Sequence, residues 1–104
     1  MNSTLLAEID KIKNLEPNWN SYQDNHVSDV AAFIAKELVE RLDLDDTCFC
    51  PLKDGGMWLL VLNGKNDIEV YIAQNGGISI KYKNNTSSNL KLLCAVDLIQ
   101  QILK

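Results

Sequence analysis

Side chains that could carry out covalent or proton-transfer chemistry are few in this chain, and His26 is its only histidine. A cysteine nucleophile would need this imidazole beside the thiol of Cys48, Cys50 or Cys94, and no local signature of such an enzyme surrounds any of them. The sequence also contains no His-Glu-x-x-His pair, no nucleophile-elbow serine and no phosphate-cradling glycine loop. Because these motifs are missing, the sequence predicts no catalytic residue.

Cys48 and Cys50 are also the closest pair of potential metal ligands, and Cys94 with His26 would complete a tetrahedral zinc site. One residue between the first two cysteines is less than the usual gap of about two to four residues in zinc knuckles. An odd number of cysteines also does not fit a secreted disulfide framework. We expect buried, reduced structural cysteines, no bound metal and no cofactor.

Asp67 and Glu69 are two residues apart, so their carboxylates lie on one face of an extended strand. Paired carboxylates can hold magnesium or transfer protons, and a small enzyme or ligand-binding subunit that uses Asp67, Glu69 and His26 is one hypothesis for the function. The other interpretation is a surface ion pair between Glu69 and Lys83. Clustering of the first three residues around a deep cleft would favour the enzyme, and their dispersal over a convex surface would favour a binding protein.

The strands that position these residues are easiest to assign between 57 and 83, where apolar residues alternate. A two-residue hairpin loop at Gly64-Lys65 gives two strands an apolar inner face and a mixed outer face. The inner face pairs Met57 with Ile72, Leu59 with Val70 and Val61 with Ile68. The outer face pairs Trp58 with Tyr71 and Leu60 with Glu69.

The next loop is predicted to be the three residues Asn75-Gly76-Gly77. A two-residue Asn75-Gly76 loop would place core residues opposite surface residues. The three-residue loop implies two apolar pairs and two favourable surface pairs. These pairs are Ile72 with Ile80, Val70 with Tyr82, Tyr71 with Lys81 and Glu69 with Lys83.

Three helices and a short edge strand at Cys48–Pro51 are expected around these strands. Apolar spacing predicts helices over residues 4–13 and from an N-cap at Ser28 to about Leu42. The stripe of the second helix is expected to hold Val30, Ile34, Leu38 and Leu42, beside Ala31 and Ala35. Residues 84–88 are predicted to be a polar break in which Ser87 or Ser88 caps a last helix. The apolar arc of that helix is broad enough to touch another helix or a second subunit.

The chain of 104 residues has the size of one domain, and we predict a single α+β domain over residues 1–104. Two helices are followed by four strands of an antiparallel β-meander and a last helix (α-α-β-β-β-β-α), with the helices packed chiefly on one face of the sheet. A composition of 46% hydrophobic and 23% charged residues is typical of a globular chain.

The distribution of charge and the lack of long apolar runs exclude several kinds of partner. The net charge is −4, and ten of the fourteen acidic residues lie in the first 46, which argues against nucleic-acid binding. No apolar run reaches the ~20 residues of a bilayer span, so no membrane partner is expected. The N-terminus lacks the basic and apolar regions of a secretory signal, and we expect a cytoplasmic protein.

The outer sheet face is predicted to carry the interaction surface. It combines apolar and aromatic residues with a charged rim: Trp58, Leu60, Leu62, Tyr71, Glu69, Lys81 and Lys83. Such a cluster is typical of a protein interface when it is exposed, and two copies could meet through it as a homodimer. The alternative is that the first helix or the 14–27 loop covers it within one chain.

The segment Leu15-Glu-Pro-Asn18-Trp19-Asn-Ser-Tyr22, followed by Val27 and a helix, resembles a family of small, uncharacterised bacterial and phage proteins. Pro51 with Gly55-Gly56 is similar to a later stretch of the same pattern. Asn20 stands where the family has Asp, and Gln23-Asp24 stands where it has Gly-Ala. The resemblance implies a bacterial or phage origin and no particular activity. We expect Asn18, Trp19 and Tyr22 to pin a long loop onto the helices.

The leading hypothesis is a non-catalytic protein-interaction module, such as a regulator, an inhibitor or an immunity-type factor. It depends on small size, an acidic surface, missing catalytic motifs and the aromatic outer face.

Overall fold

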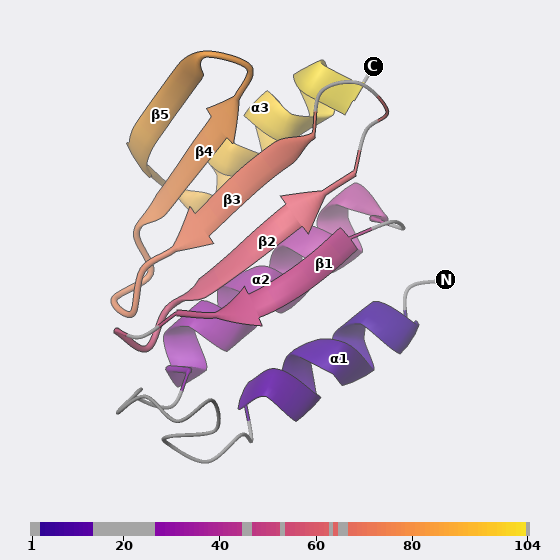
Figure 1. Cartoon of the computed structure of the whole chain (residues 1–104), viewed down its shortest axis with the longest axis vertical. Coiled ribbons are helices and arrows are strands. Elements are labelled where there is room, and N and C mark those ends of the chain that lie inside the picture. Colours follow the sequence, from indigo (N-terminus) through magenta and orange to yellow (C-terminus); the bar gives the residue numbers. More distant parts are fainter. Residues whose placement is uncertain are drawn as a thin grey trace.

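The computed structural model describes residues 3–13, 27–44, 47–52, 54–62, 64 and 67–103. Within these residues the helices are α1 (Ser3–Lys13), α2 (Asp29–Leu42) and α3 (Leu92–Leu103) (Figure 1). The strands are β1 (Thr47–Pro51), β2 (Met57–Val61), β3 (Ile68–Ile72), β4 (Ile78–Tyr82) and β5 (Asn85–Leu90). The α+β class and the order of the elements are confirmed, with one strand more than predicted.

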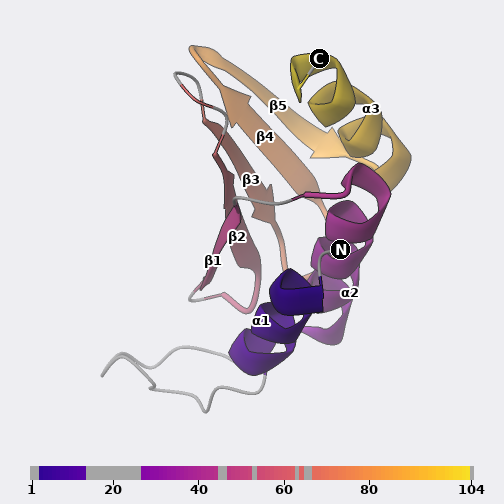
Figure 2. The same cartoon turned by 90° about the vertical axis from the view of Figure 1, so that its right-hand side faces the viewer.

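The strands form one antiparallel sheet in which neighbours in the chain are neighbours in space. All three helices lie on one side of this sheet (Figure 2). α1 packs against β1 and α2, α2 also packs against β2, β3 and α3, and α3 packs against β4. We call the side under the helices the inner face and the opposite side the outer face.

The register between β2 and β3 is the one predicted from the alternation of apolar residues. Trp58 pairs with Tyr71, and Leu59 pairs with Val70. The inner-face residues of both strands are buried: Met57, Leu59, Val61, Ile68, Val70 and Ile72. They form the core together with Leu38 and Val39 of α2 and Ile99 of α3.

The register between β3 and β4 confirms the predicted faces but not the predicted partners. The observed pairs are Ile72 with Ile78, Val70 with Ile80, Tyr71 with Ser79, Glu69 with Lys81 and Ile68 with Tyr82. The loop is Gln74–Gly76 rather than Asn75–Gly77. A three-residue loop ends on a residue in the left-handed conformation, and that residue is Gly76, with φ 97°. Each partner therefore moves by two residues, which leaves every side chain on its predicted face.

The strand β5 is formed by residues that were predicted to be a polar break and a helix cap. Lys83, with φ 55°, and Asn84 turn the chain back beside β4. Of the β5 residues, Ser87 and Leu90 pair with the inward Ile80 and Ile78. An edge strand that exposes most of its side chains needs no apolar alternation, so the usual strand signal is missing. The predicted start of the last helix at Ser87 or Ser88 is wrong, and α3 begins at Leu92.

The helix α2 has the predicted N-cap and length, and its buried side also includes Ala32 and Val39, which were not predicted. Its buried residues are Ala31, Ala32, Ala35, Leu38 and Val39. Val30, predicted to be in the stripe, is 48% exposed and lies beside the β3–β4 turn at Gly76. The broad apolar arc of α3 is explained by its contacts with both β4 and α2.

Two turns at the same end of the sheet have the same construction. Asp54-Gly55-Gly56 leads from β1 into β2, and Asn75-Gly76-Gly77 leads from β3 into β4. In each turn the Asp or Asn Oδ1 accepts a hydrogen bond from the N–H of the second glycine, at 2.9 Å and 3.1 Å. The first glycine of each has a positive φ, 94° and 97°, which glycine adopts without steric cost. We call this pair the twin turns.

Ser28 joins both twin turns to the start of α2. Its N–H donates to the carbonyl oxygen of Gly55 at 2.8 Å, and its Oγ donates to the carbonyl oxygen of Gln74 at 2.8 Å. The same Oγ accepts the N–H of Ala31 at 3.0 Å as the N-cap of the helix. One residue thus fixes the helix start over two hairpins, through its backbone N–H at one turn and its side chain at the other.

Replacing Ser28 by alanine is expected to lower the free energy of unfolding by roughly 1–2 kcal/mol, because the helix cap and the bond to Gln74 are lost together. Ser88→Ala, at an exposed serine of β5, is the matched control and should change it by less than about 0.5 kcal/mol. Chemical denaturation measures both. Equal effects of the two substitutions would contradict the role of Ser28.

Candidate interaction surface

The predicted interaction surface lies on the outer face of the sheet. Trp58 and Leu60 come from β2, Glu69 and Tyr71 from β3, and Lys81 from β4. The alternative in which the first helix covers them is wrong, because α1 packs on the inner side against β1 and α2 (Figure 2). The predicted roles of Asn18, Trp19 and Tyr22 and of the 14–26 loop segment lie outside the described residues.

Trp58 and Tyr71 form the centre of this surface. Their ring centroids are 6.5 Å apart and their planes are tilted by 42°. Tyr71 is 37% exposed and Leu62, just after β2, is 44% exposed, while Trp58 and Leu60 are half-buried. The indole Nε1 of Trp58 is buried and has no hydrogen-bond partner among the described residues.

Glu69 stands beside Tyr71 on the same strand, and its carboxylate Oε1 accepts a hydrogen bond from the Tyr71 hydroxyl at 2.9 Å. Its partner across the sheet is Lys81, so the predicted pair of Glu69 with Lys83 is wrong. Lys83 lies in the turn after β4, and its Nζ is 5.4 Å from the centroid of the Tyr82 ring. The shift of β4 by two residues accounts for this change.

The pKa of Tyr71 is raised above 10.0, first by the hydrogen bond to Glu69 and then by burial and by the negative charge of Glu69. Trp58 makes a smaller contribution in the opposite direction. Because folding raises this pKa, the stabilisation of the neutral phenol is complete below the unfolded value and is lost as pH rises through the folded value. Alkaline pH, which ionises the Tyr71 phenol, therefore removes the stability that its neutral form contributes.

Replacing Glu69 by glutamine is expected to move the titration of Tyr71 down toward 10.0, since the carboxylate supplies the main cause of the shift. Nuclear magnetic resonance of the ring signals measures the transition. Asp67→Asn removes another carboxylate, just before the start of β3, and should leave the pKa of Tyr71 unchanged. A Tyr71 transition that does not respond to Glu69→Gln would contradict the assignment.

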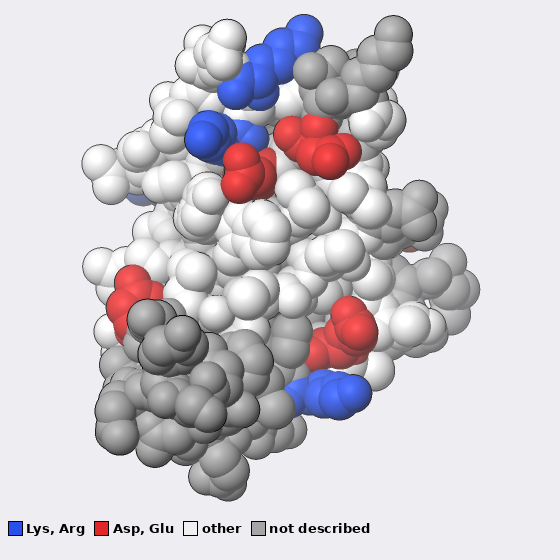
Figure 3. Space-filling model, viewed as in Figure 1, with Lys and Arg blue, Asp and Glu red and all other residues white. Residues whose placement is uncertain are grey.

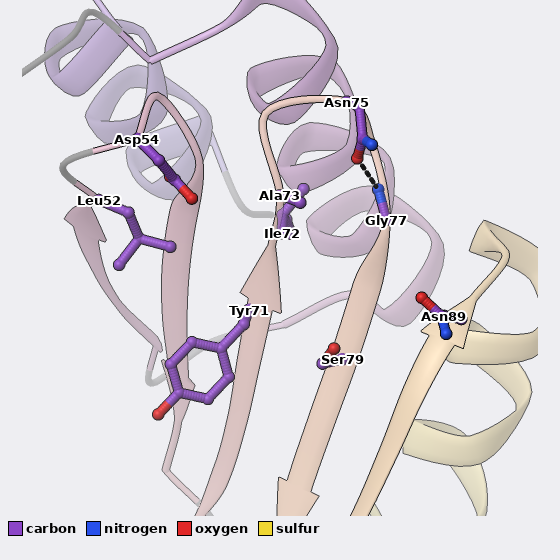
Figure 4. Close-up of a pocket in the computed structure, with 9 residues that line it drawn as sticks. All are labelled: Leu52, Asp54, Tyr71, Ile72, Ala73, Asn75, Gly77, Ser79 and Asn89. Atoms are coloured by element: carbon purple, nitrogen blue, oxygen red, sulfur yellow. Dashed lines mark hydrogen bonds between the residues drawn. The ribbon is translucent and has the colours of Figure 1, made fainter.

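A hollow of ≈ 450 Å³ opens on the outer face at the end of the sheet that carries the twin turns (Figure 4). Tyr71 forms one wall, and the polar lining comes from Asp54, Asn75, Ser79 and Asn89. Ser79 is the direct partner of Tyr71, and its short side chain leaves space between the aromatic ring and Asn89 of β5. Asn89 has φ 57° and lies where the pairing of β4 with β5 is irregular.

The alternation of apolar residues does not predict this hollow. Asp54 and Asn75 come from different loops, and Asn89 falls in a strand that the alternation does not reveal. The repeated Asx-Gly-Gly sequence is the signal that could have located two of its walls. Two like turns that follow alternate strands of a meander must lie at the same end of the sheet.

The cysteines are free thiols, and their predicted burial is wrong. Cys48 and Cys94 are exposed and Cys50 is half-buried. Cys48 pairs with Leu60 and Cys50 with Trp58, so both lie on the outer face of the edge strand, while the residues between and beside them face the core. Within the described ranges, no group of three or more His, Cys, Asp or Glu residues could hold a metal ion. His26, the other predicted zinc ligand, lies outside these ranges.

The centre of the outer face carries few charges. Figure 3 shows uncharged side chains in its middle and acidic and basic side chains together toward its upper end. The neighbours Glu69 and Lys81 supply one charge of each sign.

Among the helices of the described residues, none combines the length and the apolar character that crossing a bilayer requires.

No protein family, curated protein or solved structure matches this chain.

Proposed function

We propose that this protein is a non-catalytic protein-interaction module whose outer sheet face binds another protein chain. The observation that supports this proposal best is the Trp58–Tyr71 pair on a face that the described helices leave uncovered. Leu60 and Leu62 extend the apolar area along β2. Tryptophan and tyrosine dominate binding energy at protein interfaces because they bury large areas at a small cost in side-chain entropy.

The polar groups around the aromatic pair favour a protein partner. Glu69 and Lys81 place opposite charges side by side at the rim, which gives a partner protein both attraction and register. Nucleic acid would require a basic face, whereas the net charge of this chain is −4.

The role proposed for this module is that of a regulator, an inhibitor or an immunity-type factor acting in the cytoplasm. A bacterial or phage origin rests on the resemblance carried by Leu15–Tyr22. Such factors act by occupying a surface of another protein and need no catalytic group of their own, which agrees with the missing catalytic motifs in the sequence.

Light scattering on the wild type, Trp58→Ser and Leu93→Glu tests whether the partner is a second copy of the chain. Leu93, on α3, is 64% exposed, so its substitution probes the helix side without disturbing the core. Self-association that is lost in Trp58→Ser and kept in Leu93→Glu is the expected pattern for a homodimer through the outer face. The reverse pattern would assign the interface to α3 and contradict the proposal. A monomeric wild type would exclude the second copy and leave a different protein as partner.

A further inference from the structure

The hollow beside Tyr71 has a lining that selects one kind of ligand group. Asp54 is the only charged residue in that lining, and neither lysine nor arginine contributes to it among the described residues. Asn75, Ser79 and Asn89 contribute neutral hydrogen-bonding groups, and Leu52 and Ala73 contribute apolar surface. A lining of one carboxylate, several neutral oxygens and an aromatic wall attracts a cation and offers no counter-charge to an anion.

The carboxylate of Asp54 is held in place by the turn it belongs to. Its Oδ1 accepts the N–H of Gly56 at 2.9 Å, which orients the side chain and leaves Oδ2 for a ligand. Figure 4 shows Asp54 and Asn89 on opposite sides of the hollow, with Ser79 between them. The turn therefore places the Asp54 carboxylate before a ligand arrives, while Asn89 lies three strands away from β2, on β5 at the far side of the hollow.

We infer that the hollow binds the guanidinium group of an arginine presented by the partner protein. Guanidinium is planar and carries five N–H donors, which suits several fixed oxygens better than the point charge of a lysine. The ring of Tyr71 supplies a surface for cation–π contact, and the aliphatic stem of the arginine rests on apolar lining. The inference rests on the proposed function, because it assigns the arginine to the protein that docks on the outer face.

Nuclear magnetic resonance with Nα-acetyl-arginine amide as the probe tests this inference directly. We expect saturable shifts of the backbone amides of Gly55, Gly56, Ser79 and Asn89. The matched probe is Nα-acetyl-citrulline amide, which has the same shape and no charge. Citrulline should bind roughly tenfold more weakly, as expected for the loss of a charge-assisted hydrogen bond. Equal binding of the two probes, or shifts that do not saturate, would overturn the inference.

Asp54→Asn is the decisive variant, because asparagine keeps the Oδ1 acceptor for Gly56 and removes only the charge. It should reduce arginine binding to the level of citrulline. Asp97→Asn removes an exposed carboxylate on α3 and should leave arginine binding unchanged. Unaltered binding in Asp54→Asn would refute the inference.

The failure of this inference is distinguishable from the failure of the proposed function. If a partner binds through Trp58 and does not respond to Asp54→Asn, the arginine site is wrong and the interaction surface stands. If the arginine probe binds and no protein docks on the outer face, the hollow is a cation site and the proposed function is wrong.

Discussion

Replacing Gly56 by alanine is expected to lower the free energy of unfolding by about 3 kcal/mol or more. A Cβ atom at this position would lie 2.2 Å from the carbonyl oxygen of Ile72, which is main chain and cannot rotate away. Ile72 is also the register partner of Met57, so the shift would have to separate β2 from β3 in the middle of the sheet. For a domain of this size the melting temperature should fall by roughly 10–20 °C.

Two other glycines provide graded controls for this prediction. A Cβ at Gly77 would make only ordinary contacts, the nearest 3.5 Å from Asn75 Oδ1, so Gly77→Ala should change stability by less than about 0.5 kcal/mol. Gly64 has open space around it but φ 67°, so Gly64→Ala should cost only the ~1 kcal/mol of the left-handed conformation. Thermal and chemical denaturation measure all three. A Gly56→Ala protein as stable as Gly77→Ala would mean that β2 and β3 do not approach as described.

Replacing Trp58 by serine is expected to weaken binding to the partner by roughly 30-fold or more, which is the effect of losing a central interface tryptophan. The substitution removes the larger ring of the Trp58–Tyr71 pair. Titration calorimetry with the purified partner measures the change in Kd. Melting of the variant alone shows whether the fold is kept, since Trp58 is half-buried.

Phe33→Ser is the matched control for Trp58→Ser. Phe33 is an aromatic residue that is 60% exposed, and it belongs to α2, which lies on the inner side of the sheet (Figure 2). It should change the Kd by less than about twofold if the partner docks on the sheet. A larger loss with Phe33→Ser than with Trp58→Ser would place the interface on the helices.

The faces of the central sheet could be predicted because burial acts on every second residue. Met57, Leu59 and Val61 are apolar and inward, so one hairpin register satisfies all of them and its one-residue alternatives satisfy none. The same alternation placed Trp58 and Tyr71 outward and adjacent. Ser28 could be recognised as a helix cap because the acidic Asp29 and an apolar helical stripe follow it.

The position of the β3–β4 loop could not be obtained from the same alternation. A shift of the register by two residues keeps apolar opposite apolar, so pairing Ile72 with Ile78 or with Ile80 fits the pattern equally well. The position of the left-handed glycine decides between them, and Asn75-Gly76-Gly77 offers two candidates. The like turn at Asp54-Gly55-Gly56, where Gly55 has the positive φ, resolves the choice in favour of Gly76.

The edge strand and the hollow could not be predicted because polar side chains form them. Of the three β5 residues that pair with the inward Tyr82, Ile80 and Ile78, Asn85 and Ser87 are polar and only Leu90 is apolar, so no apolar period of two is visible. Asn89 reaches the hollow because it belongs to β5 and lies where the pairing of β5 with β4 is irregular. The site therefore depends on tertiary placement of turn residues, which composition and local pattern do not contain.

Photo-crosslinking from the outer face tests the central claim most directly. Benzoylphenylalanine is placed at Tyr71, or at Phe33 on the helix side as the control, and the protein is irradiated inside the cells from which the sequence comes. We predict a discrete crosslinked protein from position 71, absent from position 33 and lost when Trp58→Ser is added. Crosslinks from position 33 alone, or from neither position, would contradict the assignment of the outer sheet face as the interaction surface.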